Sequence, residues 1–206
     1  MGRTITAIEV QKRNKERVSI FLDGEYAFGL PLIEATHLRK GQVLAEEDIA
    51  QLQAIDERHQ AFEYAVRYLG NRPRSIQEIR HKLEQRDVED VVIDHVIERL
   101  ETLGYVDDME FARWWVRNRE DFRPRGPLAL RSELREKGID NAIIDQAINE
   151  LVDPLDSARK AAQKKFSSYR RADEITFRRR MTGYLSRRGF DYDTVRTVID
   201  ELLDEE

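Results

Sequence analysis

The chain has 206 residues, of which 40% are hydrophobic and 36% are charged, with a formal net charge of −5 and no cysteine. This length and apolar content can supply one or two ordinary cores, and the lack of cysteine excludes disulfides and thiol chemistry. No apolar run approaches the ~18 residues of a membrane span, and no signal-peptide core opens the chain. We therefore expect a cytoplasmic protein that does not associate with membranes.

The first part of the chain has the composition of a small sheet. Ile5 to Val10 and Val18 to Leu22 are rich in β-branched residues, which favour strands. Asp23-Gly24 separates the second run from Glu25 to Phe28, and this dipeptide is a strong signal of a two-residue hairpin turn. We predict a small β-hairpin-containing N-terminal extension over residues 1–55, whose role the sequence does not indicate.

The end of this extension is expected to become helical. Pro31 to His37 should form a short helix, because proline is favoured in a first turn, and Lys40-Gly41 should form a turn. From Glu46 onward, Ile49, Leu52 and Ile55 have helical spacing. This helix would lead into the remainder of the chain, and we place a domain boundary near residue 55.

The remainder consists of one pattern that occurs three times at a constant interval of 51 residues, so that Leu83, Leu134 and Leu185 are aligned. In each copy, apolar residues follow a break at the spacing of an amphipathic helix. A period longer than that of helical hairpins suggests three helices per copy. The predicted fold class is therefore mainly α, a curved helical solenoid of three tandem three-helix repeats at residues 56–106, 107–153 and 154–206.

The turn before the last helix of each copy has a specific signature. Asp87, Gly138 and Gly189 are aligned at the point where a helix must end, and glycine accepts the left-handed conformation of such a C-cap. An acidic residue that can cap the next helix stands two positions later in every copy, at Glu89, Asp140 and Asp191. We therefore predict a left-handed turn and a capped helix in each repeat.

Other helix starts and core positions can also be assigned. Ser75 and Glu78 have the spacing of a capping box, and Asp107 should cap the first helix of the second repeat. Phe111 and Trp115 share one helical stripe and are expected in the core. Trp114 points about 100° away, so it either contacts a partner or packs between repeats.

The third repeat departs from the pattern in its first helix. Ala158, Ala161 and Ala162 lie about five residues too early in the repeat frame. We therefore expect a longer loop around Ser167 to Ala172.

Positive charge gathers in the third repeat. Between Arg159 and Arg188 there are eleven lysines and arginines against two acidic residues, a density that suits phosphate or an acidic protein surface. The alternative is pairing with acids of the same repeat, and exposed pairs contribute only about 0–1 kcal/mol each. The candidate binding residues here are Arg170, Arg171, Arg178, Arg179, Arg180, Arg187 and Arg188.

A second candidate surface lies in the second repeat, where Arg119, Arg123 and Arg125 follow the tryptophan pair. No catalytic or metal-binding motif accompanies either surface: the four histidines are scattered, and the sequence has no glycine-rich phosphate loop and no nucleophile motif. We expect a protein that is not an enzyme and that has no metal and no cofactor. A helical array with a basic face is typical of a surface that binds extended partners.

These motifs resemble those of the RecX family, bacterial regulators of the RecA recombinase. The resemblance covers about residues 60–204 and rests on Arg74-Ser75-x-x-Glu78, on the run Leu103-Gly104-Tyr105-Val106-Asp107-Asp108-x-x-Phe111-Ala112-x-x-Trp115, on Gly126, on Leu134-x-x-x-Gly138-Ile139 and on Arg187-Arg188-Gly189-Phe190. Residues 1–55 are a departure, because many relatives lack such an extension.

The resemblance implies both a fold and a function. Members of the family are similar to curved arrays of three three-helix units, bind the groove of the RecA–DNA filament and restrain its ATPase, strand-exchange and co-protease activities. The expected partners are thus RecA and the RecA–DNA filament, with single- or double-stranded DNA as a further partner, and the expected state is a monomer. The alternative is a helical DNA-binding protein that uses the basic third repeat without RecA.

Overall fold

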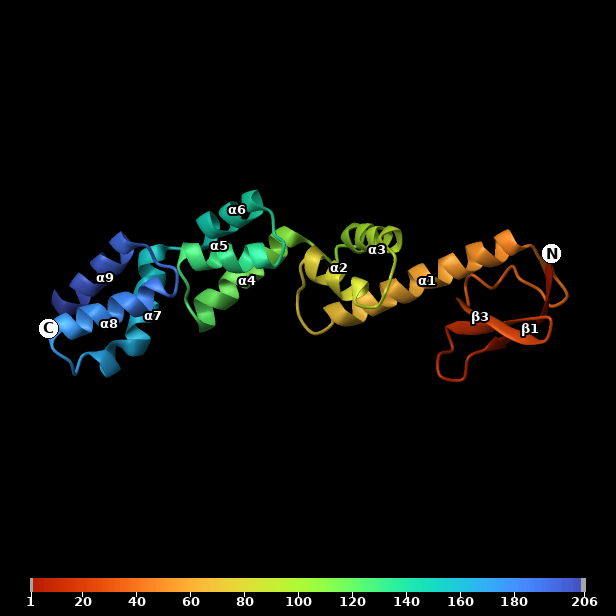
Figure 1. Cartoon of the computed structure of the whole chain (residues 1–206), viewed down its shortest axis with the longest axis horizontal. Coiled ribbons are helices and arrows are strands. Elements are labelled where there is room, and N and C mark those ends of the chain that lie inside the picture. The colour runs from red at the N-terminus through yellow and green to blue at the C-terminus, as the bar shows by residue number, and fades with distance from the viewer. Residues whose placement is uncertain (1, 205–206) are drawn as a thin grey trace. The chain divides into compact units, whose positions relative to one another are not determined.

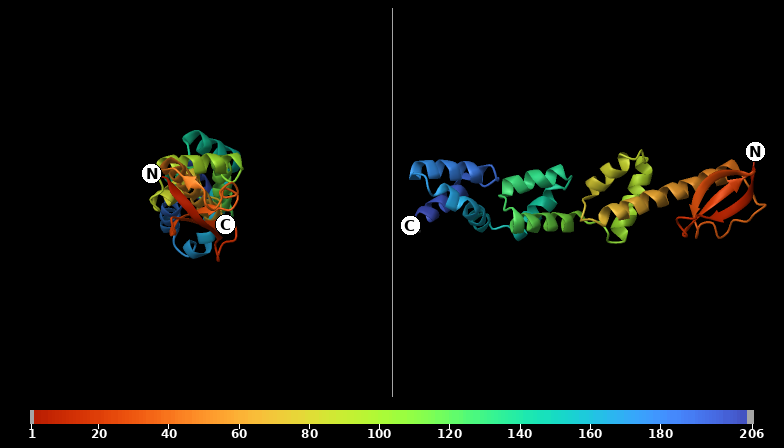
Figure 2. Two further views of the ribbon diagram at one scale, coloured as in Figure 1. Left: turned by 90° about the vertical axis from the view of Figure 1, so that its right-hand side faces the viewer. Right: turned by 90° about the horizontal axis from the view of Figure 1, so that it is seen from below.

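The computed structural model describes residues 2–204. They form nine α-helices and one four-stranded sheet, which Figures 1 and 2 show. The chain divides into two compact units, Met1–Asn71 with Arg80–Leu103 and Arg72–Ile79 with Gly104–Glu206. No helix among the described residues is long and apolar enough to cross a membrane.

The predicted hairpin is present within a larger antiparallel sheet of order β3-β2-β1-β4. Its strands are β1 (Arg3–Val10), β2 (Arg17–Leu22), β3 (Glu25–Pro31) and β4 (Val43–Leu44). Asp23 and Gly24 have φ angles of 52° and 90°, as a turn with two left-handed residues requires. One face of the sheet buries Ile5, Ile20 and Leu22 among its core residues.

The short helix expected at Pro31 to His37 is wrong, because this segment forms only hydrogen-bonded turns. Pro31 is the last residue of β3 and pairs with Arg17, so it cannot also open a helix. The Pro31 carbonyl accepts from the amides of Glu34 and Ala35 at 3.0 and 3.2 Å, which closes the first of several overlapping turns. The turn at Lys40-Gly41 is confirmed, with Gly41 at φ 88°.

Helix α1 (Glu46–Leu69) runs without a break through residue 55, where the sequence suggests a boundary. Its first half packs Leu52 against the sheet core, together with Ile49 and Ile55. Its second half buries Ala61 and Ala65 and forms the first helix of repeat 1. One helix therefore packs against the sheet with its first half and forms part of the first repeat with its second half. Figure 1 shows the strands beside its amino-terminal half.

The three repeats contain the three helices each that the period predicts. Repeat 1 combines the end of α1 with two further helices, repeat 2 is formed by α4 to α6, and repeat 3 by α7 to α9. The bounds are α2 (Ile76–Glu84), α3 (Asp90–Thr102), α4 (Asp108–Phe122), α5 (Pro127–Glu136), α6 (Asn141–Leu151), α7 (Pro154–Tyr169), α8 (Glu174–Ser186) and α9 (Tyr192–Asp204).

The left-handed turns are confirmed, since Asp87, Gly138 and Gly189 have φ angles of 57°, 77° and 85°. The acidic caps are confirmed for two repeats. Asp140 accepts from the amide of Ala142 at 2.8 Å, and Asp191 accepts from the amide of Thr194 at 2.9 Å. Glu89 precedes α3 but makes no side-chain cap.

The longer loop expected in repeat 3 is wrong. Helix α7 starts early but continues to Tyr169, and α8 also starts early, at Glu174. The connection is therefore Arg170 to Asp173, equal in length to the connection between α4 and α5. The shift of α7 is taken up by about one additional helical turn at the start of α8.

Candidate partner-binding surface

The first joint between repeats uses Ser75 and Glu78, but only half of the predicted capping box forms. Ser75 Oγ accepts from the amide of Glu78 at 3.1 Å and donates to the carbonyl of Lys137 at 2.7 Å. Glu78 does not return a hydrogen bond to the helix start. Its carboxylate instead accepts from Arg72 Nη2 and from Lys137 Nζ, both at 2.8 Å. These residues therefore tie α2 to the turn that follows α5.

The electrostatics of this joint favour an ionised carboxylate. Burial alone would raise the pKa of Glu78, but the hydrogen bonds and positive charges of Arg72 and Lys137 lower it to about 2. Asp108 adds a further link, because its Oδ1 accepts from the amide of Ile76 at 2.9 Å. Sequence reasoning missed the roles of Asp108 and Lys137, which depend on contacts far apart in the chain.

The second joint repeats the first, one period later along the chain. The amide of Gly126, aligned with Ser75, donates to the carbonyl of Arg188, aligned with Lys137, at 2.8 Å. The amide of Leu128 donates to the carbonyl of Gly189 at 3.2 Å. A left-handed turn thus places one carbonyl in the first joint and two in the second on the amino-terminal end of a helix in the preceding repeat.

This contact also explains the glycines. A Cβ on Gly138 would lie 2.5 Å from Cβ of Gln77, and a Cβ on Gly189 would lie 2.3 Å from the backbone nitrogen of Ala129. Gly126 is equally restricted, since its Cβ would lie 2.2 Å from the Gly189 carbonyl oxygen. Close packing between repeats therefore requires glycine at these positions, in addition to the positive φ of the turn.

The second joint has further polar contacts away from the turn. Ser157, which is buried, donates its hydroxyl to Glu120 Oε2 at 2.6 Å, and Lys164 Nζ donates to the Phe122 carbonyl at 2.9 Å. Burial raises the pKa of Glu120, although Ser157 and Lys160 oppose the shift.

The two tryptophans do not differ in burial as the helical stripe suggests. Trp114 and Trp115 are both half-buried, and each ring centroid lies 5.9 Å from that of Phe111, which is buried. Trp114 packs against the core of its own repeat. What distinguishes Trp115 is its Nε1, which donates to Glu133 at 2.8 Å.

Glu133 also holds two of the candidate arginines of the second repeat. Arg119 Nε lies 2.7 Å from Glu133, and the guanidinium carbon of Arg119 lies 4.3 Å from the centre of the Trp115 ring. Arg125 Nε lies 3.4 Å from the other carboxylate oxygen. Arg123 is exposed. Of this set, Arg119 and Arg125 are therefore committed to the fold, and Arg123 faces solvent.

The basic third repeat divides in the same way. Arg178 is paired with Glu174 at 2.9 Å and with Asp200 at 2.6 Å, so the alternative of pairing within the repeat holds for this residue. Arg188 donates to the Pro124 carbonyl at 3.1 Å and lies over the Tyr184 ring. The guanidinium carbon of Arg170 lies 5.7 Å from the centre of the Phe166 ring.

Three arginines remain on one face of α8 and its end, and we call Arg179, Arg180 and Arg187 the α8 basic face. All three are exposed, as is Arg171 in the preceding loop. Within residues 2–204, none of these four arginines has a carboxylate partner. Arg187 follows Arg179 by eight residues and Arg180 by seven, so the three side chains project within about 100° of one another around the helix axis.

A substitution in the repeat frame contributes to this excess of charge. Repeats 1 and 2 contain aligned pairs, Arg80 with Asp94 and Arg131 with Asp145. The acid of this pair is replaced in repeat 3 by Arg196. A position that is acidic in two repeats is therefore basic in the third, where Arg196 of α9 lies 3.8 Å from Asp200.

The remaining motif residues stabilise the second repeat. Asp107 caps α4 as predicted, accepting from the amides of Met109 and Glu110 at 2.7 and 3.1 Å. Tyr105, which precedes this cap, is 56% exposed. Its side chain is thus available at the surface.

Comparison with known proteins identifies the family to which this arrangement belongs. Family models match in the expected order: the Regulatory protein RecX N-terminal domain at residues 3–45, and the first, second and third RecX three-helix domains at 61–100, 107–148 and 152–199. The chain belongs to the RecX family. The match at residues 3–45 corrects the view that the β-containing segment is a departure from the RecX pattern, because this segment is itself a RecX domain.

Individual RecX proteins are similar over nearly the whole chain. The Regulatory protein RecX of Bacillus pumilus is 35% identical over 97% of this chain and 78% of its own length, and that of Listeria welshimeri is 31% identical over 98% and 76%. A crystal structure of regulatory protein RecX has a TM-score of 0.76 at 30% identity, covering 96% of this chain and 99% of that one. RecX from Lactobacillus salivarius has a TM-score of 0.65 at 26% identity, covering 71% of this chain and 97% of that one.

Proposed function

We propose that this protein binds the RecA–DNA filament and restrains the ATPase, strand-exchange and co-protease activities of RecA. The observation that carries the proposal is the match of all four RecX domains, in order, over nearly the whole chain. In this proposal the protein is a regulator and not an enzyme. It acts as a monomer in the cytoplasm, in homologous recombination, DNA repair and the SOS response, and requires no cofactor.

The α8 basic face is the surface that we assign to the DNA of the filament. A guanidinium without a carboxylate partner keeps its donors for phosphate oxygens, and Arg179, Arg180 and Arg187 are in this condition within residues 2–204. Arg178, which adjoins them, is held by Glu174 and Asp200. It should therefore contribute little to binding.

The first experiment measures DNA-dependent ATP hydrolysis by RecA with this protein added below stoichiometry. The expected result is inhibition by the wild type and weaker inhibition by the triple variant Arg179→Ala, Arg180→Ala, Arg187→Ala. Each lost phosphate contact should reduce the slope of log affinity against log salt by about 0.9 on duplex DNA or about 0.7 on single strands.

The matched control removes three exposed positive charges elsewhere, with Lys12→Ala, Arg13→Ala and Arg39→Ala. It has the same change in net charge and should inhibit RecA like the wild type. If the α8 triple variant retains both inhibition and salt slope, the α8 basic face is not the DNA contact.

The guanidiniums of the α8 basic face also favour one alternative, a helical DNA-binding protein that acts without RecA. Titration against DNA, RecA and the RecA–DNA filament distinguishes the two functions. Tightest binding to the filament supports the regulator, and equal binding to bare DNA and filament supports the alternative.

A further inference from the structure

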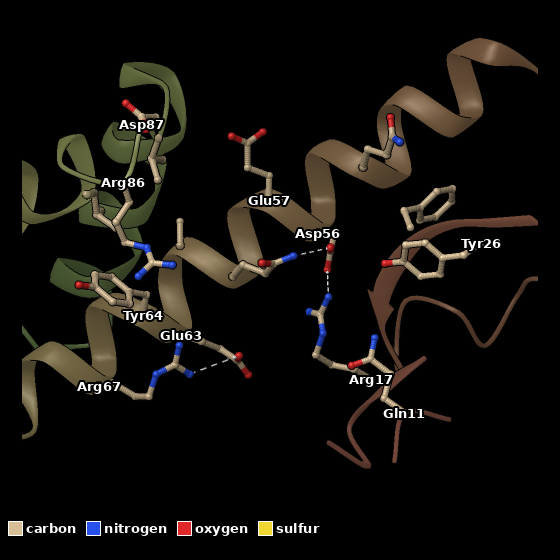
Figure 3. Close-up of a pocket in the computed structure, with 16 residues that line it drawn as sticks. Gln11, Arg17, Tyr26, Asp56, Glu57, Glu63, Tyr64, Arg67, Arg86 and Asp87 are labelled. Atoms are coloured by element: carbon tan, nitrogen blue, oxygen red, sulfur yellow. Dashed lines mark hydrogen bonds and ion pairs between the residues drawn. The ribbon is translucent and has the colours of Figure 1, made fainter. Parts of the chain in front are cut away.

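A polar groove of about 750 Å³ lies between the sheet, α1 and the turn that follows α2. Figure 3 shows Arg17 and Tyr26 approaching it from the sheet, Asp56 and Tyr64 lining it from α1, and Arg86 and Asp87 closing it from the turn. All of its lining residues belong to the first compact unit. Neither of the proposed contact surfaces described above includes this groove.

The turn at this groove is the repeat 1 copy of the turn that forms both joints. Arg86 is aligned with Lys137 and Arg188, each of which places its carbonyl on a donor of the preceding repeat. Among the hydrogen bonds of residues 2–204, none is accepted by the carbonyls of Arg86 and Asp87. No repeat precedes repeat 1, so no donor of this kind reaches these two carbonyls, and both residues line the groove.

The side chains of the turn repeat the pattern as well. The guanidinium carbon of Arg86 lies 4.3 Å from the centre of the Tyr64 ring, as Lys137 Nζ lies 5.4 Å from that of Trp115, one period later. Lys137 also pairs with Glu78, which lies in the first turn of α2. Within the described chain, Arg86 has no such carboxylate.

The wall of the groove is a fixed frame. Arg17 Nη2 lies 2.5 Å from Asp56 Oδ1, both side chains are about nine-tenths buried, and Gln60 donates to the other Asp56 oxygen at 2.6 Å. A Cβ on Gly29 would lie 2.8 Å from Arg17 Nη2, so glycine leaves room for this guanidinium across the sheet. Sheet and α1 are therefore clamped together at the position where an occupant would bind.

The charges that line the groove do not suit phosphate. Three cationic side chains are outnumbered by four carboxylates, which are Asp56, Glu57, Glu63 and Asp87. The amino-terminal end of a helix carries a partial positive charge and unpaired N–H donors. Such an end suits open carbonyls beside a carboxylate.

We propose that this groove binds the amino-terminal turn of a helix from the protein component of the filament, and that a carboxylate in that turn pairs with Arg86. The open carbonyls and the Asp87 carboxylate accept the N–H donors of the incoming helix, as the turns of repeats 2 and 3 accept donors from the repeats before them. This inference rests on the proposed binding to RecA and deepens it, because it assigns RecA, and not DNA, to this end of the chain.

The test compares filament binding by the full-length protein and the variant Arg86→Glu, with RecA assembled on single-stranded DNA as the probe. We expect Arg86→Glu to weaken binding at least about tenfold, because reversing one charge of a close interfacial pair is strongly unfavourable. The slope of log affinity against log salt should not fall by the value of about 0.7 that one lost phosphate contact removes on single-stranded DNA. The control Arg58→Glu makes the same charge change on α1 at an exposed residue that does not line the groove, and it should bind like the wild type.

A photo-crosslinking amino acid in place of Glu57, an exposed groove residue, identifies the occupant. Crosslinks to the first turn of a RecA helix support the proposal, and charge reversal of the acid found there should restore binding to Arg86→Glu. Crosslinks to DNA or to other parts of RecA overturn it. If the wild type binds the filament and Arg86→Glu binds it equally well, the groove is not the contact, while the proposed function still stands. Absence of wild-type binding overturns the proposed function together with it.

Discussion

Replacement of Gly189 by alanine should separate the two demands that the structure makes on this residue. The φ angle of 85° is unfavourable for any residue with a Cβ, at a cost of about 1–2 kcal/mol. The added Cβ would also lie 2.3 Å from the nitrogen and 2.5 Å from the Cβ of Ala129. Backbone cannot move aside as the end of a side chain can, so the joint between repeats 2 and 3 must open.

The chain supplies two glycines that grade this effect. Gly104 has a φ of 69° with nothing within 4 Å of its ideal Cβ, so Gly104→Ala should lose only the backbone term, about 1–2 kcal/mol. Gly138 faces Cβ and Cγ of the exposed Gln77 at 2.5 and 2.8 Å, which can shift in part. Overpacking typically costs about 1–3 kcal/mol more, so Gly189→Ala should lose about 2–5 kcal/mol, with Gly138→Ala between the two.

Urea unfolding followed by circular dichroism measures these losses, and m-values close to that of the wild type show that the same transition is compared. From the most to the least stable, the expected order is wild type, Gly104→Ala, Gly138→Ala and Gly189→Ala. Equal losses for Gly104→Ala and Gly189→Ala would mean that the glycines serve the turn conformation alone. The account of the joints given above would then be wrong.

Two further predictions concern side chains that the structure connects. Glu78 has a pKa of about 2 against an ordinary value of 4.5. Its ionised form therefore adds stability that is complete above about pH 4.5 and is lost as the pH falls toward 2. Because its partners Arg72 and Lys137 are partly exposed, we expect this stability to be about 1–2 kcal/mol. The free energy of unfolding of Glu78→Gln should therefore fall less between pH 4.5 and pH 2 than that of the wild type. The same fall in both proteins would contradict the assignment. Trp115→Phe should cost about 1–2 kcal/mol through the lost hydrogen bond to Glu133, whereas Trp114→Phe should cost less. Thermal unfolding of the two variants tests this, and the reverse order would show that packing, not Glu133, distinguishes the rings.

The features that the sequence predicted well are those that local chemistry determines. Gly24, Gly138 and Gly189 take left-handed conformations, which glycine adopts more readily than other residues. Asp23 also takes one, as aspartate does more often than most side chains. The 51-residue period places three helices in each repeat, since apolar spacing alone defines each buried face. Pro31 does not start the predicted helix, because its pairing with Arg17 in the sheet overrides its preference for a first helical turn.

The candidate site was harder to predict because its charged residues are all arginines, and what separates them is whether a carboxylate lies beside each one in the fold. Arg178 and Arg179 are neighbours in the sequence, yet the ~100° between successive helical residues directs only Arg178 toward Asp200. Glu133 fixes Arg119 and Arg125 from a different helix. The repeat period relates the two joints, since Gly126 and Arg188 stand 51 residues after Ser75 and Lys137, respectively. Once the structure shows the contact between Ser75 and Lys137, this offset predicts the second joint from the first.

The joints also explain why the three repeats differ at the two ends of the series. A turn that docks on a preceding repeat needs glycine, and repeats 2 and 3 have it in Gly138 and Gly189. Repeat 1 has Asp87 at this position, so its turn keeps the left-handed conformation, but a helix that docks there must leave room for the Asp87 side chain. At the other end, α8 begins about one turn earlier than α2 and α5 in the repeat frame. As a result the amide of Phe177, aligned with that of Gly126, donates to the Asp173 carbonyl at 2.8 Å and not to a docking turn. Each terminal repeat therefore lacks the feature that would extend the series, and the surfaces left open, the groove beside Asp87 and the α8 basic face, are free to contact other molecules.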